Sequence, residues 1–184
     1  MKLRIALTSL LALVLVVCAA LGHRAAADHR EVALRAALRG LNEVPPTTSR
    51  ATATLRATLD EAGQRISFTL EYRNMMANPT AAHFHFGPTK VNGGVMVFLC
   101  GGGGQPACPP ATSGKITGTI TAANVVGPGD QGIAPRNFAD VVYAILTGNA
   151  YVNIHSSRFP NGELRGQVEP SGAGRAEDRA GSED

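Results

Sequence analysis

Strict alternation of apolar and polar residues between positions 51 and 72 is the strongest constraint on the fold of this chain. The apolar positions are Ala51, Ala53, Leu55, Ala57 and Leu59, followed by Ile66, Phe68, Leu70 and Tyr72. A period of two places such residues on one face of a strand. The short segment Glu61–Gly63 separates the two runs and predicts a turn. The segment therefore predicts a hairpin with one face in the core and one in water.

The rest of the chain adds short strands and a single helix. Further strands are predicted at residues 32–38, 81–87, 95–99, 115–121, 151–155 and 163–168. The period changes to that of a helix at Phe138, Val141, Val142, Ile145 and Leu146, which predicts one helix at about residues 137–147. Asn137 is a suitable N-cap, and Gly148 can end the helix. The predicted fold class is all-β, an antiparallel Greek-key β-sandwich with one short helix.

The N-terminus carries the pattern of a secretory signal peptide over residues 1–27. Basic Lys2 and Arg4 precede an uncharged, mainly apolar run from Ile5 to Leu21, and small residues follow at 25–27. A retained membrane anchor is the alternative, because the run is at the lower end of the spanning range. We therefore expect a secreted or periplasmic protein that touches a membrane only if this segment is uncleaved.

The remaining chain divides into one domain and a tail. Residues 28–169 hold all the predicted strands, whereas residues 170–184 contain nothing to bury and predict a disordered tail. The whole chain has 17 basic and 14 acidic residues, and three of the basic ones lie in residues 1–27, which hold no acid. The mature chain is therefore electrically balanced, at 14 basic against 14 acidic residues. Such a balance gives no electrostatic support for binding nucleic acid.

Two cysteines remain after removal of the predicted signal, Cys100 and Cys108. A glycine-rich segment separates them, and in an exported protein this arrangement favours a disulfide that closes a local loop. A soft-metal site is the alternative, although the spacing matches no zinc pattern.

Three histidines fall on strand faces that point away from the predicted core. His83 and His85 alternate with two phenylalanines and lie about 7 Å apart along their strand, and His155 occupies the polar face of residues 151–155. Three neutral imidazoles are the ligand set of open zinc sites and also suit copper. The alternative is that these histidines simply face solvent. A solvent face rarely needs two histidines in such close alternation, which favours the metal.

Glu163 and Arg165 are predicted on the non-core face of the strand that follows His155. As an exposed ion pair they would contribute little to stability. Near the histidines, Arg165 and Glu163 would instead support the metal ligands or draw small anions to the site. Nucleophilic catalysis has no support, because both cysteines are expected to be oxidised.

Four segments of the chain, in this order, resemble the CHRD domain, the module named after chordin and also found in exported bacterial proteins. These segments are Leu41–Pro46, Ala82–Gly87, Tyr151–His155 and Gly162–Gln167, within about residues 31–169. The resemblance implies a β-sandwich like that of immunoglobulins or superoxide dismutase, and no defined activity.

A weaker resemblance is to copper/zinc superoxide dismutase. His83 and His85 are similar to that enzyme's His-x-His pair, His155 to its later copper ligand, and Arg165 to its anion-guiding arginine. The chain lacks the bridging histidine and the zinc-binding loop of that family, which argues against a dinuclear enzyme.

These observations together predict an exported β-sandwich that binds one transition metal, copper before zinc, through three histidines. The alternative is an interaction module that binds an extracellular or envelope partner without metal. A superoxide-dismuting enzyme is the least favoured expectation, and the chain is more typical of a binding protein than of an enzyme.

Overall fold

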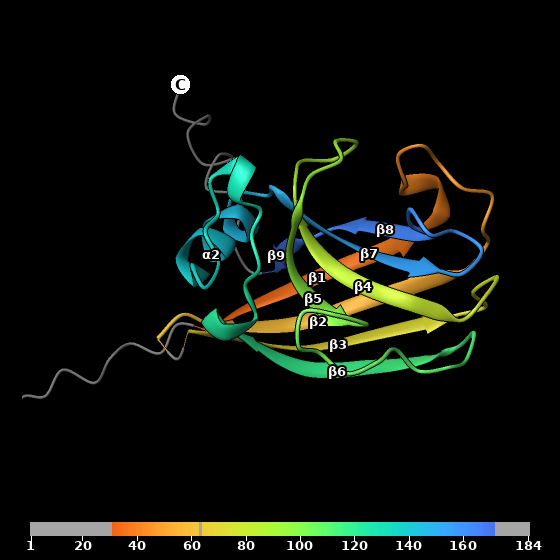
Figure 1. The fold of residues 1–184 in the computed structure, drawn as a ribbon, viewed down its shortest axis with the longest axis horizontal. Coiled ribbons are helices and arrows are strands. Elements are labelled where there is room, and N and C mark those ends of the chain that lie inside the picture. The colour runs from red at the N-terminus through yellow and green to blue at the C-terminus, as the bar shows by residue number, and fades with distance from the viewer. Residues whose placement is uncertain (1–30, 63, 172–184) are drawn as a thin grey trace, which may run out of the picture.

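The computed structural model describes residues 31–62 and 64–171 as a sheet of nine strands with one α-helix (Figure 1). The predicted signal peptide and residues 172–184 of the predicted tail lie outside the described residues. The strands are β1 (Glu31–Arg39), β2 (Thr52–Asp60), β3 (Arg65–Arg73), β4 (Pro79–Phe86), β5 (Val95–Cys100), β6 (Gly114–Thr121), β7 (Ala150–Ser156), β8 (Leu164–Gln167) and β9 (Glu169–Ser171). Three short 3-10 turns, η1 (Gly40–Asn42), η2 (Ala122–Asn124) and η3 (Gly129–Gln131), and the helix α2 (Phe138–Leu146) complete the described elements.

The hairpin predicted from the alternating residues is present as β2 and β3. The two strands pair antiparallel without a register shift, with Leu55 opposite Leu70. The apolar positions of both strands are buried, and most of the intervening polar positions are exposed. The period-two pattern therefore identified both the strands and the face that each buries.

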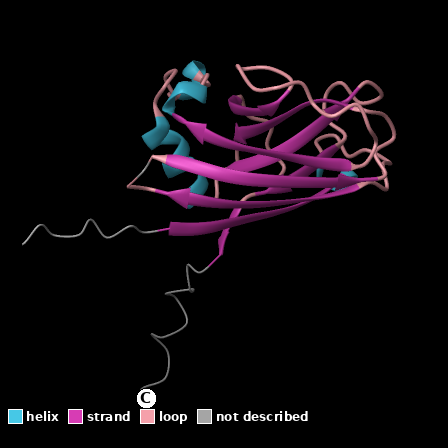
Figure 2. Cartoon of the chain, turned by 90° about the horizontal axis from the view of Figure 1, so that it is seen from below, coloured by secondary structure: helices cyan, strands magenta, loops and turns pink. Residues whose placement is uncertain are grey.

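The strands pair in the order β5-β4-β7-β8-β1-β2-β3-β6, with β9 added beside β1, and every pairing is antiparallel. Figures 1 and 2 show that this sheet curves round until its two ends approach each other. An isolated bridge between Val97 of β5 and Val125, just after β6, narrows the remaining gap. The all-β antiparallel fold is confirmed. The Greek-key sandwich stays a prediction, because the pairings form one nearly closed sheet.

Helix α2 lies at one end of the curved sheet (Figure 1). Its N-cap is Asn137, whose side chain accepts a hydrogen bond from the Asp140 N–H, and Gly148 just beyond the end has a positive φ of 74°. Phe138, Val141 and Ile145 bury the inner face of the helix in the main core. Within the described residues, no helix has the length and apolar character needed to cross a membrane.

The C-terminal part of the domain extends further than the sequence predicts. Pro170 and Ser171, which fall within the predicted tail, form β9 with Glu169 and pair with β1 at Ala33 and Leu34. The predicted start of the tail at residue 170 is therefore wrong. Backbone pairing orders these residues although their side chains have little to bury.

The predicted disulfide between Cys100 and Cys108 is present, with 5.0 Å between the two Cα atoms. Cys100 ends β5 and is buried in the core, and Cys108 packs against the same core from the following loop. The bond fastens the glycine-rich segment between them to the end of the sheet.

Replacing both cysteines in Cys100→Ala/Cys108→Ala should lower the free energy of unfolding by about 2–3 kcal/mol, since the unfolded chain regains the entropy of a short loop. Urea unfolding measures the change, and reduction of the unmodified protein should give a similar loss. An unfolding midpoint that moves in neither experiment would contradict this role.

Candidate metal centre

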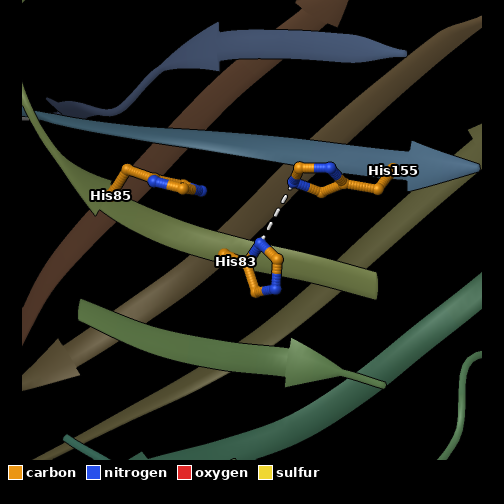
Figure 3. A group of neighbouring side chains, drawn as sticks. All are labelled: His83, His85 and His155. Carbon is orange, nitrogen blue, oxygen red and sulfur yellow. Dashed lines mark hydrogen bonds between the residues drawn. The ribbon is translucent and has the colours of Figure 1, made fainter. Parts of the chain in front are cut away.

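Pairing of β4 with β7 brings the three predicted histidines together. In this pairing His83 lies opposite Asn153, and His155 lies opposite Ala81. One ring nitrogen from each histidine lies within 4.8 Å of the other two, and His83 Nδ1 is 3.2 Å from His155 Nε2 (Figure 3). Two ligands on a tetrahedral ion, with bonds near 2.0–2.1 Å, are about 3.3 Å apart. The His83–His155 pair therefore has the spacing of two ligands on one ion, and a nitrogen of His85 lies within 4.8 Å of both.

The face that carries the histidines is not open to solvent. His83 and His85 are only 7% and 8% exposed. The edge of the His83 ring packs against Phe98 at 4.4 Å, and His85 stacks on Tyr151 at 4.7 Å, both between ring centroids. The alternative that the histidines simply face water is therefore wrong for His83 and His85, and His155 is half-buried. Loops fold over this outer face of the sheet and turn it into a second, polar interior.

Backbone carbonyls define the protonation of two of the rings. His85 Nδ1 lies 2.9 Å from the Gly93 oxygen, and His155 Nδ1 lies 2.8 Å from the Pro160 oxygen. A carbonyl oxygen only accepts, so each Nδ1 carries the proton and donates it. The Nε2 atom of each neutral ring then presents a lone pair toward the centre of the group.

Asn153 completes the group from the middle of β7. Its Oδ1 lies 3.0 Å from His85 Nε2 and 3.0 Å from His155 Nε2. With both rings neutral and protonated on Nδ1, this oxygen faces two lone pairs, and the donor within reach of the group is the ring of His83, whose Nδ1 lies 3.2 Å from His155 Nε2. Three acceptor atoms thus share the one proton of His83, and a cation in this space would satisfy all three.

Burial keeps the three rings neutral. It lowers the pKa of His83 to about 3 and that of His85 to about 4, and it also lowers the pKa of His155. The neighbouring histidines lower the first two pKa values further, because two positive rings would repel each other. Protonation at ordinary pH therefore does not supply the missing positive charge.

Glu43 lies beside this group and was not among the predicted site residues. Its side chain is 6% exposed, and burial raises its pKa to about 7, although the positive charge of Arg165 and hydrogen bonding with Asn153 oppose the rise. Its Oε1 has no hydrogen-bond partner among the described residues. Gly162, with φ of 123°, leaves the necessary space, because a Cβ there would lie 2.5 Å from Oε1 and 3.0 Å from Asn153 Nδ2.

The resemblance to superoxide dismutase predicts an arginine that points into the histidine group. Arg165 instead points to a loop and to the Tyr151 ring. Its side chain is only 2% exposed, and its guanidinium donates to Asn92 Oδ1 and to the carbonyl oxygens of Pro88 and Val91. The guanidinium also lies 3.4 Å from the centre of the Tyr151 ring, which stacks on His85. Arg165 therefore holds a covering loop and the ring stack in place.

Glu163 is also buried, but away from the histidines. Its carboxylate accepts hydrogen bonds from Ser49 Oγ at 2.8 Å, the Met76 N–H at 2.8 Å and Ser156 Oγ at 2.5 Å. The structure thus brings Glu163 neither to the imidazoles nor into an ion pair with Arg165. It joins three segments of backbone, which is a structural role.

The sequence analysis did not identify Asn153 and Glu43 as site residues, because neither residue type by itself indicates a metal site. An asparagine in a strand and a glutamate before a proline pair are common, although Asn153 and Glu43 both fall in the four segments that carry the family resemblance. A third is Gly93, where a Cβ would overlap the Phe86 carbonyl, so that only glycine can present its own oxygen to His85.

Comparison with protein families matches the CHRD domain over residues 34–168. The chain belongs to the CHRD domain family. Neither the curated proteins nor the solved structures yielded a match. The four segments of the family resemblance meet in the structure. In chain order they contribute Glu43, then His83 and His85, then Asn153 and His155, and finally Arg165.

Replacing the buried acid in Glu43→Gln should change how stability depends on pH. The folded protein binds the Glu43 proton more tightly than the unfolded chain does, so this group's contribution is present below pH 4.5 and is lost as pH rises to about 7. As pH rises across that window, the free energy of unfolding of the variant should increase relative to that of the unmodified protein by up to about 3 kcal/mol, at 1.36 kcal/mol per pKa unit.

Urea unfolding at a series of pH values measures this difference, and contributions of the histidines cancel because both proteins carry them. Glu71→Gln makes the same chemical change at an exposed position. Its free energy of unfolding should differ from that of the unmodified protein by nearly the same amount at every pH. A Glu43→Gln difference that stays equally constant would contradict the raised pKa.

Proposed function

We propose that this CHRD domain binds one transition-metal ion through His83, His85 and His155, with copper as the first candidate and zinc as the second. The observation that carries the proposal is a group of three acceptor atoms, His85 Nε2, His155 Nε2 and Asn153 Oδ1, that share the single donor of the His83 ring. Backbone carbonyls orient the rings of His85 and His155, and the Nε2 atom of each ring lies 3.0 Å from the Asn153 oxygen. A cation in this space would replace repulsion between acceptors with coordination.

The donor set supports a metal of intermediate softness. Three imidazole nitrogens and one amide oxygen suit copper or zinc and lack the several carboxylates that calcium prefers. Copper is placed first because divalent copper binds more tightly than zinc to a given nitrogen and oxygen site. Gly93 and Pro160 act on the metal through the rings, since their carbonyl oxygens hold each ligand in its binding tautomer.

Export of the mature domain from the cytosol is part of the proposal. The disulfide between Cys100 and Cys108 supports an oxidising compartment, because such bonds rarely persist in the cytosol. The signal-peptide pattern of residues 1–27 supports the same conclusion. A secreted or periplasmic metal-binding protein would acquire its ion outside the cytosol.

Metal analysis of the mature protein after incubation with copper tests the ligand set. The unmodified protein should retain one copper per chain, and His83→Ala/His85→Ala should retain none, because two of the three imidazoles are gone. His29→Ala removes a histidine outside the proposed set and should leave the stoichiometry unchanged. No copper or zinc bound by the unmodified protein at micromolar metal would refute the site.

Asn153 provides a second, finer test. Asn153→Ala should weaken copper binding by roughly tenfold to a hundredfold, the range found when groups that support metal ligands are removed. Asn153→Asp keeps an oxygen at the same place and should bind at least as tightly as the unmodified protein. Equal affinity of all three proteins, measured by competition with a chelator, would remove Asn153 from the site.

The competing function is an extracellular interaction module in which the buried histidines only support the covering loops. Capture of one envelope or extracellular partner by the mature protein, equally well with and without copper, would favour that function. Superoxide consumption by the copper-loaded protein would instead favour an enzyme.

A further inference from the structure

A cleft lies on the outer face of β1, β2 and β8, and none of the three histidines lines it. Its volume is about 850 Å³, within the range of small-molecule sites. The charged residues of its lining are the cations Arg35, Arg56, Lys90 and Arg165 and the acids Glu43 and Glu169. The cleft therefore has more cationic than acidic side chains, next to apolar surface.

Two of the cations are placed directly opposite each other. Arg35 of β1 and Arg56 of β2 are register partners, so their Cβ atoms lie about 4.5–5.5 Å apart on the exposed face. Like charges in this arrangement destabilise a sheet. Glu169 faces Arg35 from β9, but no ion pair joins them, and within the described residues none involves Arg56 or Lys90. This leaves positive charge without a protein partner.

Arg165 gives the cleft a rigid floor. Its guanidinium is held by three hydrogen bonds and by the Tyr151 ring, so its charge cannot swing away into solvent. A charge fixed in advance costs no ordering when a ligand arrives. Because the mature chain is electrically balanced, this cluster is a local feature and not the result of a generally basic surface.

Part of the wall is apolar. Leu41 in η1 is 78% exposed, the largest exposure among the large apolar side chains of the described residues, and Val44 and Pro46 also line the cleft. Such a wall would contact a carbon skeleton, whereas an inorganic ion would leave it in water.

We infer that this cleft binds a small organic anion whose carboxylate, phosphate or sulfate group pairs with Arg35 and Arg56 and whose apolar part lies against Leu41. The guanidinium fork matches the oxygen geometry of such groups. The anion would relieve repulsion between the two arginines, and Lys90 would contribute at the rim. This site does not depend on the metal.

Titration calorimetry of the mature protein with phenyl phosphate tests the inference. One site per chain is expected, with affinity that falls as sodium chloride is added, because the contacts with the arginines are solvent-exposed. Inorganic phosphate lacks the ring and benzyl alcohol lacks the charge, so each should bind at least about tenfold more weakly, the equivalent of 1.4 kcal/mol.

Matched variants locate the site. Arg35→Gln/Arg56→Gln should weaken phenyl phosphate binding by about tenfold or more, since each charged hydrogen bond contributes well above thermal energy. Arg50→Gln removes an exposed charge outside the lining and should bind normally. Binding by His83→Ala/His85→Ala should also be normal, which separates this proposal from that of the metal centre.

Three results would overturn the inference. The first is no binding of millimolar phenyl phosphate by the unmodified protein. The second is equal weakening by Arg50→Gln and by the Arg35/Arg56 double variant, which would indicate general surface charge. The third is binding of benzyl alcohol as tight as that of phenyl phosphate, which would indicate an apolar pocket without anion recognition.

Discussion

The buried Glu163 carboxylate is the contact on which the polar side of this domain depends. A carboxylate is costly to bury unless donors surround it, and here Ser49, Met76 and Ser156 supply them. These donors come from the loop before β2, the loop before β4 and the end of β7. Thr47 adds a bond to the Glu163 carbonyl oxygen. The segment that carries Glu43 is thereby tied to the strands that carry the histidines.

Around that anchor, the domain has two interiors of opposite character. The concave side of the sheet holds Phe84, Val152 and Ile154 in a conventional apolar core. The reverse side of the same strands holds neutral imidazoles, an amide and a partly ionised acid, under loops whose own carbonyls serve as acceptors. Residues of β4 and β7 therefore enter a packed environment on either face of the sheet, and this explains why Thr80 is the single exposed position of these two strands.

Much of the fold was predictable because strand periodicity depends on neighbours along the chain. The hairpin, the helix cap at Asn137 and the opposite faces of Phe84 and His83 all follow from local pattern. The burial of the histidine face was not predictable, since it comes from loops distant in sequence. The partners of Glu163 and Arg165 were not predictable for the same reason: the face of their strand was inferred correctly, but not which loops would fold over it.

The order of the strands also constrains when the domain can form. β1 lies between β2, its neighbour in sequence, and β8 and β9, which come more than a hundred residues later. Until residues 164–171 are available, β1 and β7 each expose an unpaired edge, and the polar interior lacks the strand that carries Arg165. A growing chain cannot complete the sheet from its N-terminal half. The domain therefore stays incomplete until its last strands have been synthesised.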